Sequence, residues 1–284
     1  MKNFSISRMD QSEINFALTM ARHEGWNPGL YDAIPYFHTD PNGFFIGKTG
    51  HLPIACGSAV IYNKKEAFFG LHIVKENYRG YSYGKKLMRA RLDYVSTRNI
   101  GLDGEPTKIK SYLKLGFKRK YANIRYDISG AKAMANDNDN EGIINLRTWP
   151  LSSLVEYDCQ MFPASRHTFL RHWINQPQTI ALAYLENNAI KGYIVFRKCF
   201  RGYKIGPLFA NSYDIANHLL LNALNHRVDN EQVYIDLPEP NKDAIRLAKN
   251  FNGQPIFKTS RMYSKKVPDI DINRIFGITS FELG

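Results

Sequence analysis

Apolar and polar positions in the first part of the chain follow two periods in turn. Runs that are apolar throughout or at every second position have the pattern of strands, and apolar residues three and four apart have the pattern of amphipathic helices. The pattern predicts strands at 53–62, 66–74, 99–103 and 117–128, with helices at 83–97 and 107–115. Strands that alternate with helices are typical of an α/β fold.

The same order of elements returns later in the chain. The second set of predicted elements has strands at 179–186, 190–199, 203–210, 231–237 and 255–265, and helices at 213–227 and 241–251. The match is closest late in each set, where IGLDGEP, a helix and Arg125-Tyr126 parallel YIDLPEP, a helix and Arg261-Met262-Tyr263. A repeat this long indicates two copies of one domain rather than a solenoid.

Small and polar residues separate the two copies. The segment SGAKAMANDNDNEG has an Asn/Asp run and no apolar periodicity, which is typical of an interdomain linker. We therefore predict a front domain at 1–128, a linker at 129–142, a rear domain at 143–268 and a tail at 269–284. The tail is too short to fold alone, so we expect it to dock on one of the domains.

Length and composition fit a folded protein of two domains. The chain has 284 residues, of which 44% are hydrophobic and 23% charged, and these values exclude a disordered or fibrous chain. No stretch reaches the roughly 18 apolar residues of a membrane span, and residues 1–13 lack the apolar core of a signal peptide. We expect a cytoplasmic protein, and the alternative is a secreted effector that acts in a host cytosol.

Positive charge is concentrated in the front domain. Residues 1–128 carry 20 Lys and Arg against 11 Asp and Glu, which is nine of the twelve net positive charges of the chain. Such a field fits a phosphate-bearing cofactor, a nucleic acid or an acidic membrane. Nucleic acid is not favoured, because Tyr121 beside Arg119 and Lys120 is too little aromatic and basic surface for it.

The cysteines do not indicate a metal site or a disulfide framework. Cys56, Cys159 and Cys199 are odd in number and widely spaced, with no C-x-x-C motif and no His pair at metal spacing. We predict no bound metal. Cys56 lies in an apolar strand, so we expect it in the core rather than at a reacting centre.

The most informative stretch is LHIVKENYRGYSYGKKLM at 71–88, where an apolar strand leads through an Arg-Gly loop into a helix. The first backbone N–H groups of a helix have no partner within it, and with the positive end of the helix dipole they bind phosphates. Gly80 and Gly84 allow close approach, while Arg79 and Lys85 add positive charge. This stretch predicts a pyrophosphate site.

The loop resembles the signature of the GNAT superfamily of acetyl-CoA-dependent N-acetyltransferases, Arg/Gln-x-x-Gly-x-Gly/Ala. The signature falls on residues 79–84, with Ser82 where the family usually has Gly. About 30 residues later, Tyr112-Leu-Lys-Leu-Gly116-Phe117 resembles the family's Tyr-x-x-x-Gly-Phe element. The resemblance implies two tandem GNAT-like domains, each a mixed twisted sheet flanked by helices, and acetyl-CoA as cosubstrate.

Site residues follow from this resemblance position by position. Tyr112 matches the tyrosine that protonates the leaving thiolate, and the pantetheine chain is expected along the strand at 72–74. The residues expected to bind acetyl-CoA are His72, Ile73, Val74, Arg79, Gly80, Tyr81, Ser82, Tyr83, Gly84 and Lys85. Glu105 stands where the family often has Asn, which departs from the family's cofactor contacts.

The general base has several candidates. Alternation along the strand at 66–74 puts Glu66, Gly70 and His72 on one face, and we take Glu66 as the candidate base, with a water or His72 as alternatives. Both residues also have a purely structural explanation, with Glu66 as an exposed residue at the start of a strand and His72 as a packed strand residue. Trp26 and Tyr31 are candidate acceptor-pocket residues, although aromatic packing under a loop is commoner.

The resemblance implies an acetyl-CoA-dependent N-acetyltransferase that acts by direct transfer to a primary amine. The acceptor is left open as a small molecule or a protein amine, and the sequence does not determine the oligomeric state. One alternative from another class is a non-catalytic acyl-CoA-binding or protein-interaction module. A second alternative is a secreted effector acetyltransferase.

The rear copy keeps the late helix, as Asn241 to Leu247, but has a changed phosphate loop. Alignment of the helices puts Asp214 opposite Ser82 and Ala216 opposite Gly84. We predict that Asp214 caps the rear helix and fills the anion site from within. We therefore expect one acetyl-CoA site per chain, in the front domain, with the rear domain as scaffold and one wall of the acceptor cleft.

Overall fold

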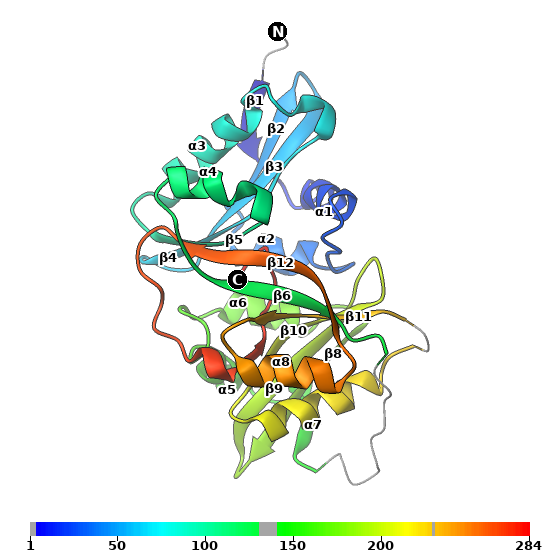
Figure 1. The fold of residues 1–284 in the computed structure, drawn as a ribbon. Helices are drawn as coiled ribbons and strands as arrows, with labels where there is room; N and C mark the ends of the chain where they lie inside the picture. The colour runs from blue at the N-terminus through cyan, green and yellow to red at the C-terminus, as the bar shows by residue number, and fades with distance from the viewer. Residues whose placement is uncertain (1–3, 131–140, 229–230) are drawn as a thin grey trace.

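The computed structural model describes residues 4–130, 141–228 and 231–284. Within these residues the strands form one mixed sheet, in the order β1-β2-β3-β4-β5-β12-β6-β11-β10-β9-β8-β7, with β13 paired to β10 (Figure 1). The strands of the front half are β1 (Phe4–Arg8), β2 (Phe44–Thr49), β3 (Leu52–Ile61), β4 (Glu66–Val74), β5 (Asn99–Gly104) and β6 (Lys118–Asp127). Those of the rear half are β7 (Ile143–Asn145), β8 (Thr179–Glu186), β9 (Ala189–Lys198), β10 (Tyr203–Ala210), β11 (Val233–Pro238), β12 (Gln254–Tyr263) and β13 (Ile275–Gly277).

The two halves exchange a strand at the middle of the sheet. β6 of the front half pairs antiparallel with β11 and β12 of the rear half, and β12 also pairs with β5 of the front half. Counted inward from either edge of the sheet, five strands of one half are followed by one strand of the other half. This symmetry agrees with a duplicated domain. The predicted linker falls mostly on residues 131–140, which lie outside the described residues.

A buried ion pair crosses each exchanged junction. Arg125 of β6 donates to both carboxylate oxygens of Asp236 in β11, at 2.6 and 2.8 Å, and Arg261 of β12 donates to both carboxylate oxygens of Asp103 in β5, at 3.1 and 2.8 Å. Burial opposes ionisation of Asp236, but the charge of Arg125 outweighs it and lowers the pKa of this carboxyl. Because removal of one partner from a buried pair costs about 3–5 kcal/mol, these pairs fix the junction of the halves.

Helices cover both faces of the sheet. In the front half, α3 (Tyr83–Val95) and α4 (Ile109–Lys114) share an apolar cluster with one face, and α7 (Tyr213–Leu224) and α8 (Lys242–Asn250) do the same in the rear half. The remaining helices lie in a third cluster that takes side chains from both halves: α1 (Ile14–His23), α2 (Ala33–Thr39), α5 (Leu151–Asp158) and α6 (His167–Trp173). No helix of the described residues is long and apolar enough to cross a membrane.

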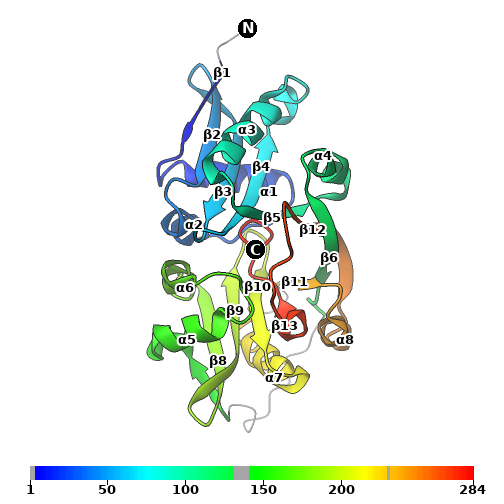
Figure 2. The same cartoon turned by 90° about the vertical axis from the view of Figure 1, so that its left-hand side faces the viewer.

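The tail is buried between the two halves. Figures 1 and 2 both show the end of the chain at the centre of the molecule, between the two halves. Residues 275–284 are all buried. The tail therefore docks on both halves, where the sequence analysis expected one. The α/β prediction, with a mixed sheet flanked by helices, is confirmed.

Candidate active site

A cavity of about 1020 Å³ lies in the front half, where β4 and β5 diverge. The parallel pairing of these strands ends at Phe69 and Leu102. Beyond this point every residue of β4 from Gly70 to Val74 lines the cavity. Its volume is at the upper limit of the usual range for ligand sites, about 300–1,000 Å³.

A β-bulge changes the face that β4 presents to this cavity. Leu71 has a positive φ of 51°, and the pairing with β3 shifts register between Cys56 and Ser58. Such a bulge inserts one extra residue and reverses the alternation of faces beyond it. The prediction that Glu66 and His72 share a face is therefore wrong, because strict alternation ends at the bulge.

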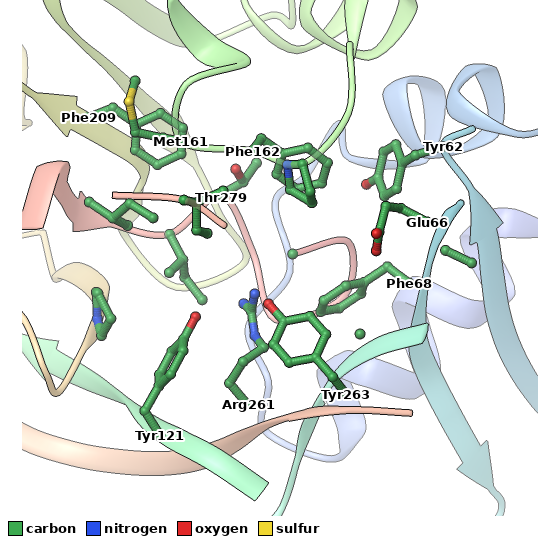
Figure 3. A pocket seen from close by; sticks show the side chains of 18 residues that line it. Tyr62, Glu66, Phe68, Tyr121, Met161, Phe162, Phe209, Arg261, Tyr263 and Thr279 are labelled. Atoms are coloured by element: carbon green, nitrogen blue, oxygen red, sulfur yellow. The ribbon is translucent and has the colours of Figure 1, made fainter. Parts of the chain in front are cut away.

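Glu66 lies at a different, small cavity between the halves (Figure 3). Its Oε2 accepts from Asn99 Nδ2 at 2.9 Å, and Tyr62 and Phe68 line the same cavity. Glu66 is not among the described residues that line the large cavity. Burial raises the pKa of its carboxyl.

A buried arginine of α3 holds the bulge in place. Arg91 is 1% exposed and donates to the carbonyl oxygens of Ser58 at 2.8 Å and Gly70 at 3.1 Å. Arg91 was not predicted from the sequence as a site residue. Its signal was the helix period, since Arg91 falls in phase with Leu87 and Val95 on the apolar face of the helix.

Arg91 also fixes the protonation of His72. Its Nη1 lies 2.8 Å from His72 Nδ1, and because a guanidinium only donates, Nδ1 must accept and the ring proton must be on Nε2. Burial, and then the charge of Arg91, lowers the pKa of His72 to about 3. His72 is therefore a neutral donor at neutral pH. Its Nε2 lies 3.3 Å from the position that a Cβ at Gly84 would take, so this N–H faces the start of α3.

We expect this neutral histidine to make folding stability depend on pH. Its folded pKa of about 3 is below the unfolded value, so the unfolded state binds the extra proton and stability falls as pH drops from about 6.5 toward 3. His72→Gln keeps an acceptor for Arg91 and does not titrate. Urea unfolding should show that the free energy of unfolding falls more in wild type than in His72→Gln between about pH 7 and about pH 4.5. The difference should be up to about 1.4 kcal/mol per pH unit. Equal losses in the two proteins would contradict the assignment.

The loop before α3 presents free backbone donors to the cavity. Ser82 precedes the helix in the left-handed region with φ of 63° and makes no side-chain cap, so the first N–H groups of α3 are not satisfied by it. Gly80 also has a positive φ, of 90°. Arg79 donates to Val74 O at 2.9 Å and pairs with Glu24. An uncapped helix start with nearby cations fits an anionic ligand.

Most of the residues predicted to bind acetyl-CoA come together in this cavity. Those among its lining are His72, Ile73, Val74, Arg79, Gly80, Ser82, Tyr83, Gly84 and Lys85. Tyr81 differs, because its side chain is 66% exposed and its ring stacks on Tyr83. Lys108 and Lys114 add positive charge to the lining from the α4 side.

Tyr112 lies on the α4 wall of the same cavity. Its ring packs on the backbone of Gly104 and edge-on against Phe117. Burial, and to a lesser extent the charge of Glu105, raises the pKa of Tyr112, although Arg91 opposes this. Tyr112 therefore holds its phenolic proton throughout the neutral range.

The far wall of the cavity is tied to the segment EGWNPG. The Trp26 indole N–H donates to Glu105 Oε1 at 2.7 Å, and the carbonyl oxygen of Trp26 accepts from Arg125 at 3.0 Å and Lys204 at 3.3 Å. Trp26 and Glu105 line the cavity, whereas Tyr31 does not lie among its lining residues. Cys56 is fully buried as predicted, and burial raises the pKa of its thiol to about 12.

The helix that follows the rear loop is capped by a different residue from the one predicted. Helix α7 begins at Tyr213, and the side chain of Ser212 caps it by accepting from Ile215 N at 3.3 Å. Asp214 lies within the first turn, so the prediction that Asp214 is the cap is wrong. The rear helix starts two positions earlier than its front counterpart, which leaves less loop for an anion.

Comparison with known families matches both halves. The model of the acetyltransferase (GNAT) family matches residues 12–117, and that of the acetyltransferase (GNAT) domain matches residues 154–277. A holothin acyltransferase from Pseudoalteromonas sp. (strain SANK 73390) is 29% identical over 262 residues, which cover 92% of this chain and 88% of the relative.

Solved structures agree on the fold. A "putative acetyltransferase" from Pyrococcus horikoshii superposes with a TM-score of 0.85 at 23% identity, over 100% of this chain and 97% of its own. A tandem GNAT protein from the clavulanic acid biosynthesis pathway, solved without acetyl-CoA, gives a TM-score of 0.63 at 12% identity, over 93% and 100% of the two chains. At these identities the likeness concerns the fold alone.

Proposed function

Because the chain belongs to the GNAT family of acyltransferases, as a tandem of two such domains, we propose that its front half binds acetyl-CoA and transfers the acetyl group to a primary amine. The observation that carries this proposal is the lining of one cavity, which combines the groups that an acetyl transfer to an amine needs. The uncapped start of α3, the diverging edge of β4 and the protonated Tyr112 all line it.

The lining suits each part of such a cosubstrate. The N–H groups at the start of α3, with Arg79 and Lys85, would hold the pyrophosphate. The edge of β4 at His72–Val74 would receive the pantetheine chain. Acetyl-CoA supplies a thioester, whose acetyl group passes to the amine nitrogen as the C–N bond forms and the C–S bond breaks.

Two side chains would handle the protons of this transfer. Tyr112 O–H would give its proton to the departing thiolate. Glu105 would take the proton that the amine loses, since it lines the cavity near Tyr112 and Trp26 occupies only its Oε1. We assign the base to Glu105 rather than Glu66 because Glu66 faces the other cavity.

The two carboxylates can be compared directly. We expect Glu105→Gln to lower kcat by roughly 10²-fold, as for loss of one proton-transfer group, and Glu66→Gln to leave kcat within about 2-fold. Thiol release from acetyl-CoA, measured against pH, is the assay. A loss in Glu66→Gln with none in Glu105→Gln would return the base to Glu66.

The proposed function itself is tested by thiol release with a panel of amines. The panel contains holothin, because the relative is a holothin acyltransferase, together with tryptamine, glucosamine, spermidine and a lysine peptide. Mass spectrometry should find an acetylated amine with at least one of them. Tight acetyl-CoA binding without acetylation of any amine would favour the non-catalytic binding module.

A further inference from the structure

The groove of the rear half that corresponds to the front cavity holds the chain's own tail. The parallel pairing of β10 and β11 ends at Ile205 and Ile235, as that of β4 and β5 ends in the front half. β13 lies beyond this point and pairs antiparallel with β10. On its other side the amide of Ile278 donates to the carbonyl of Asp236 in β11 at 2.7 Å.

Side chains of the rear half fix the tail in this groove. Arg274 of the tail donates to Asn211, which begins the rear loop. Asn241 caps α8 with its Oδ1 and turns its Nδ2 toward the tail. This amide lies within 3.3 Å of three tail carbonyl oxygens, those of Ile272, Asn273 and Ile275. The tail therefore pairs with β10 as an added strand, and it also uses the side chains of Asn211 and Asn241, which are polar groups of the rear groove.

Past the groove the tail turns against the front half. The hydroxyl of Ser280 accepts from the amides of Glu282 and Leu283 at 3.2 and 3.1 Å, which closes a tight turn. Tyr62 of the front half donates to Leu283 O at 2.6 Å. At Gly70 a Cβ would lie 2.2 Å from the carbonyl oxygen of Glu282, so only glycine allows this contact with β4.

The turn directs Phe281 into the front cavity. Phe281 lines the cavity, and its neighbour Glu282 packs on Gly70, where β4 first diverges from β5. Its ring centroid lies 5.9 Å from that of Phe257, which β12 contributes. Trp26 completes this part of the wall. Three aromatic residues from three separate segments thus line the cavity, and Arg125, which lies over the rings of Phe257 and Phe281 and donates to Trp26 O, contacts all three.

We propose that the tail, seated in the rear groove, is a specificity element of the front cavity and that Phe281 contacts the body of the acceptor. This inference rests on the proposed function. Aromatic walls favour a flat apolar body, which can stack on the rings, over a flexible polyamine chain, which has no ring to stack. The acceptor class is therefore an amine carried on an aromatic ring system.

A matched pair of substitutions tests the role of the tail. Phe281→Leu and Phe276→Leu make the same change at two tail positions, but Phe276 is buried in the core of the rear half. With tryptamine as probe, we expect Phe281→Leu to raise KM about 3-fold and Phe281→Ala about 10-fold. Phe276→Leu should not change it, and KM for acetyl-CoA should stay within about 2-fold in all three.

Calorimetric binding of tryptamine to the protein saturated with CoA gives a second readout that needs no turnover. The same order of affinities is expected, with spermidine weaker than tryptamine in wild type. Equal effects of the two Phe→Leu changes, or tighter binding of spermidine, would overturn the proposal. Failure of every amine to release thiol would instead refute the proposed function, and the calorimetric comparison would still decide the role of Phe281.

Discussion

Gly84→Asp should abolish acetyl-CoA binding while the protein stays folded. Gly84 lies in the first turn of α3, and its side-chain position faces His72 and Val74 within the cavity. A carboxylate there would lie against the pyrophosphate of acetyl-CoA in the proposed complex. Two like charges about 4 Å apart repel by about 4 kcal/mol at an effective dielectric of about 20, which is roughly a 10³-fold loss of affinity. Isothermal calorimetry measures this loss.

Gly84→Ala is the matched control for crowding. Its Cβ would lie 3.3 Å from His72 Nε2 and 3.6 Å from Val74 Cγ2, so the neighbours need to shift only slightly. We expect a loss of less than about 10-fold, because no charge is added. If Ala and Asp weaken binding equally, steric exclusion and not phosphate repulsion explains the effect. Unchanged affinity in Gly84→Asp would show that the pyrophosphate binds elsewhere.

Tyr112→Phe should lower kcat by roughly 10²-fold and leave acetyl-CoA affinity unchanged. The substitution removes one proton-transfer contribution and keeps the ring that packs on Gly104 and Phe117. Because the pKa of Tyr112 is raised, the acid stays protonated past the ordinary tyrosine pKa of about 10. Wild-type kcat should therefore not decline through this group until the pH exceeds about 10.

Tyr121→Phe is a control at a half-buried tyrosine that lines the small cavity instead. Stopped thiol-release assays at saturating substrates should find its kcat within about 2-fold of wild type. A wild-type kcat in Tyr112→Phe would indicate that water, and not Tyr112, protonates the departing thiolate. Loss of acetyl-CoA affinity in the same variant would mean that the hydroxyl binds the cosubstrate.

Sequence patterns predicted the local parts of this site well. The strand, the Arg-Gly loop and the helix at 71–88 follow from apolar spacing and from backbone donors at a helix start, which are properties of neighbouring residues. Glycines at 80 and 84 mark the same turn. The cavity collects these residues because they are adjacent in the chain.

The parts that were missed depend on distant residues. The bulge places Leu71 at a positive φ, which is uncommon for a branched apolar residue and has no local signal. The strand exchange and the seating of the tail pair residues more than 100 positions apart, as at Tyr62 and Leu283. Arg91 had a signal in the helix period, but its partners lie on two other strands.

The central claim is that the chain has one acetyl-CoA site, which lies in the front half. Calorimetric titration of the wild-type protein with acetyl-CoA tests it most directly. The account predicts one cosubstrate per chain, and no binding in Gly84→Asp, because the tail fills the rear groove through Asn241 and Asp236. A stoichiometry of two, or of one that persists in Gly84→Asp, would contradict it.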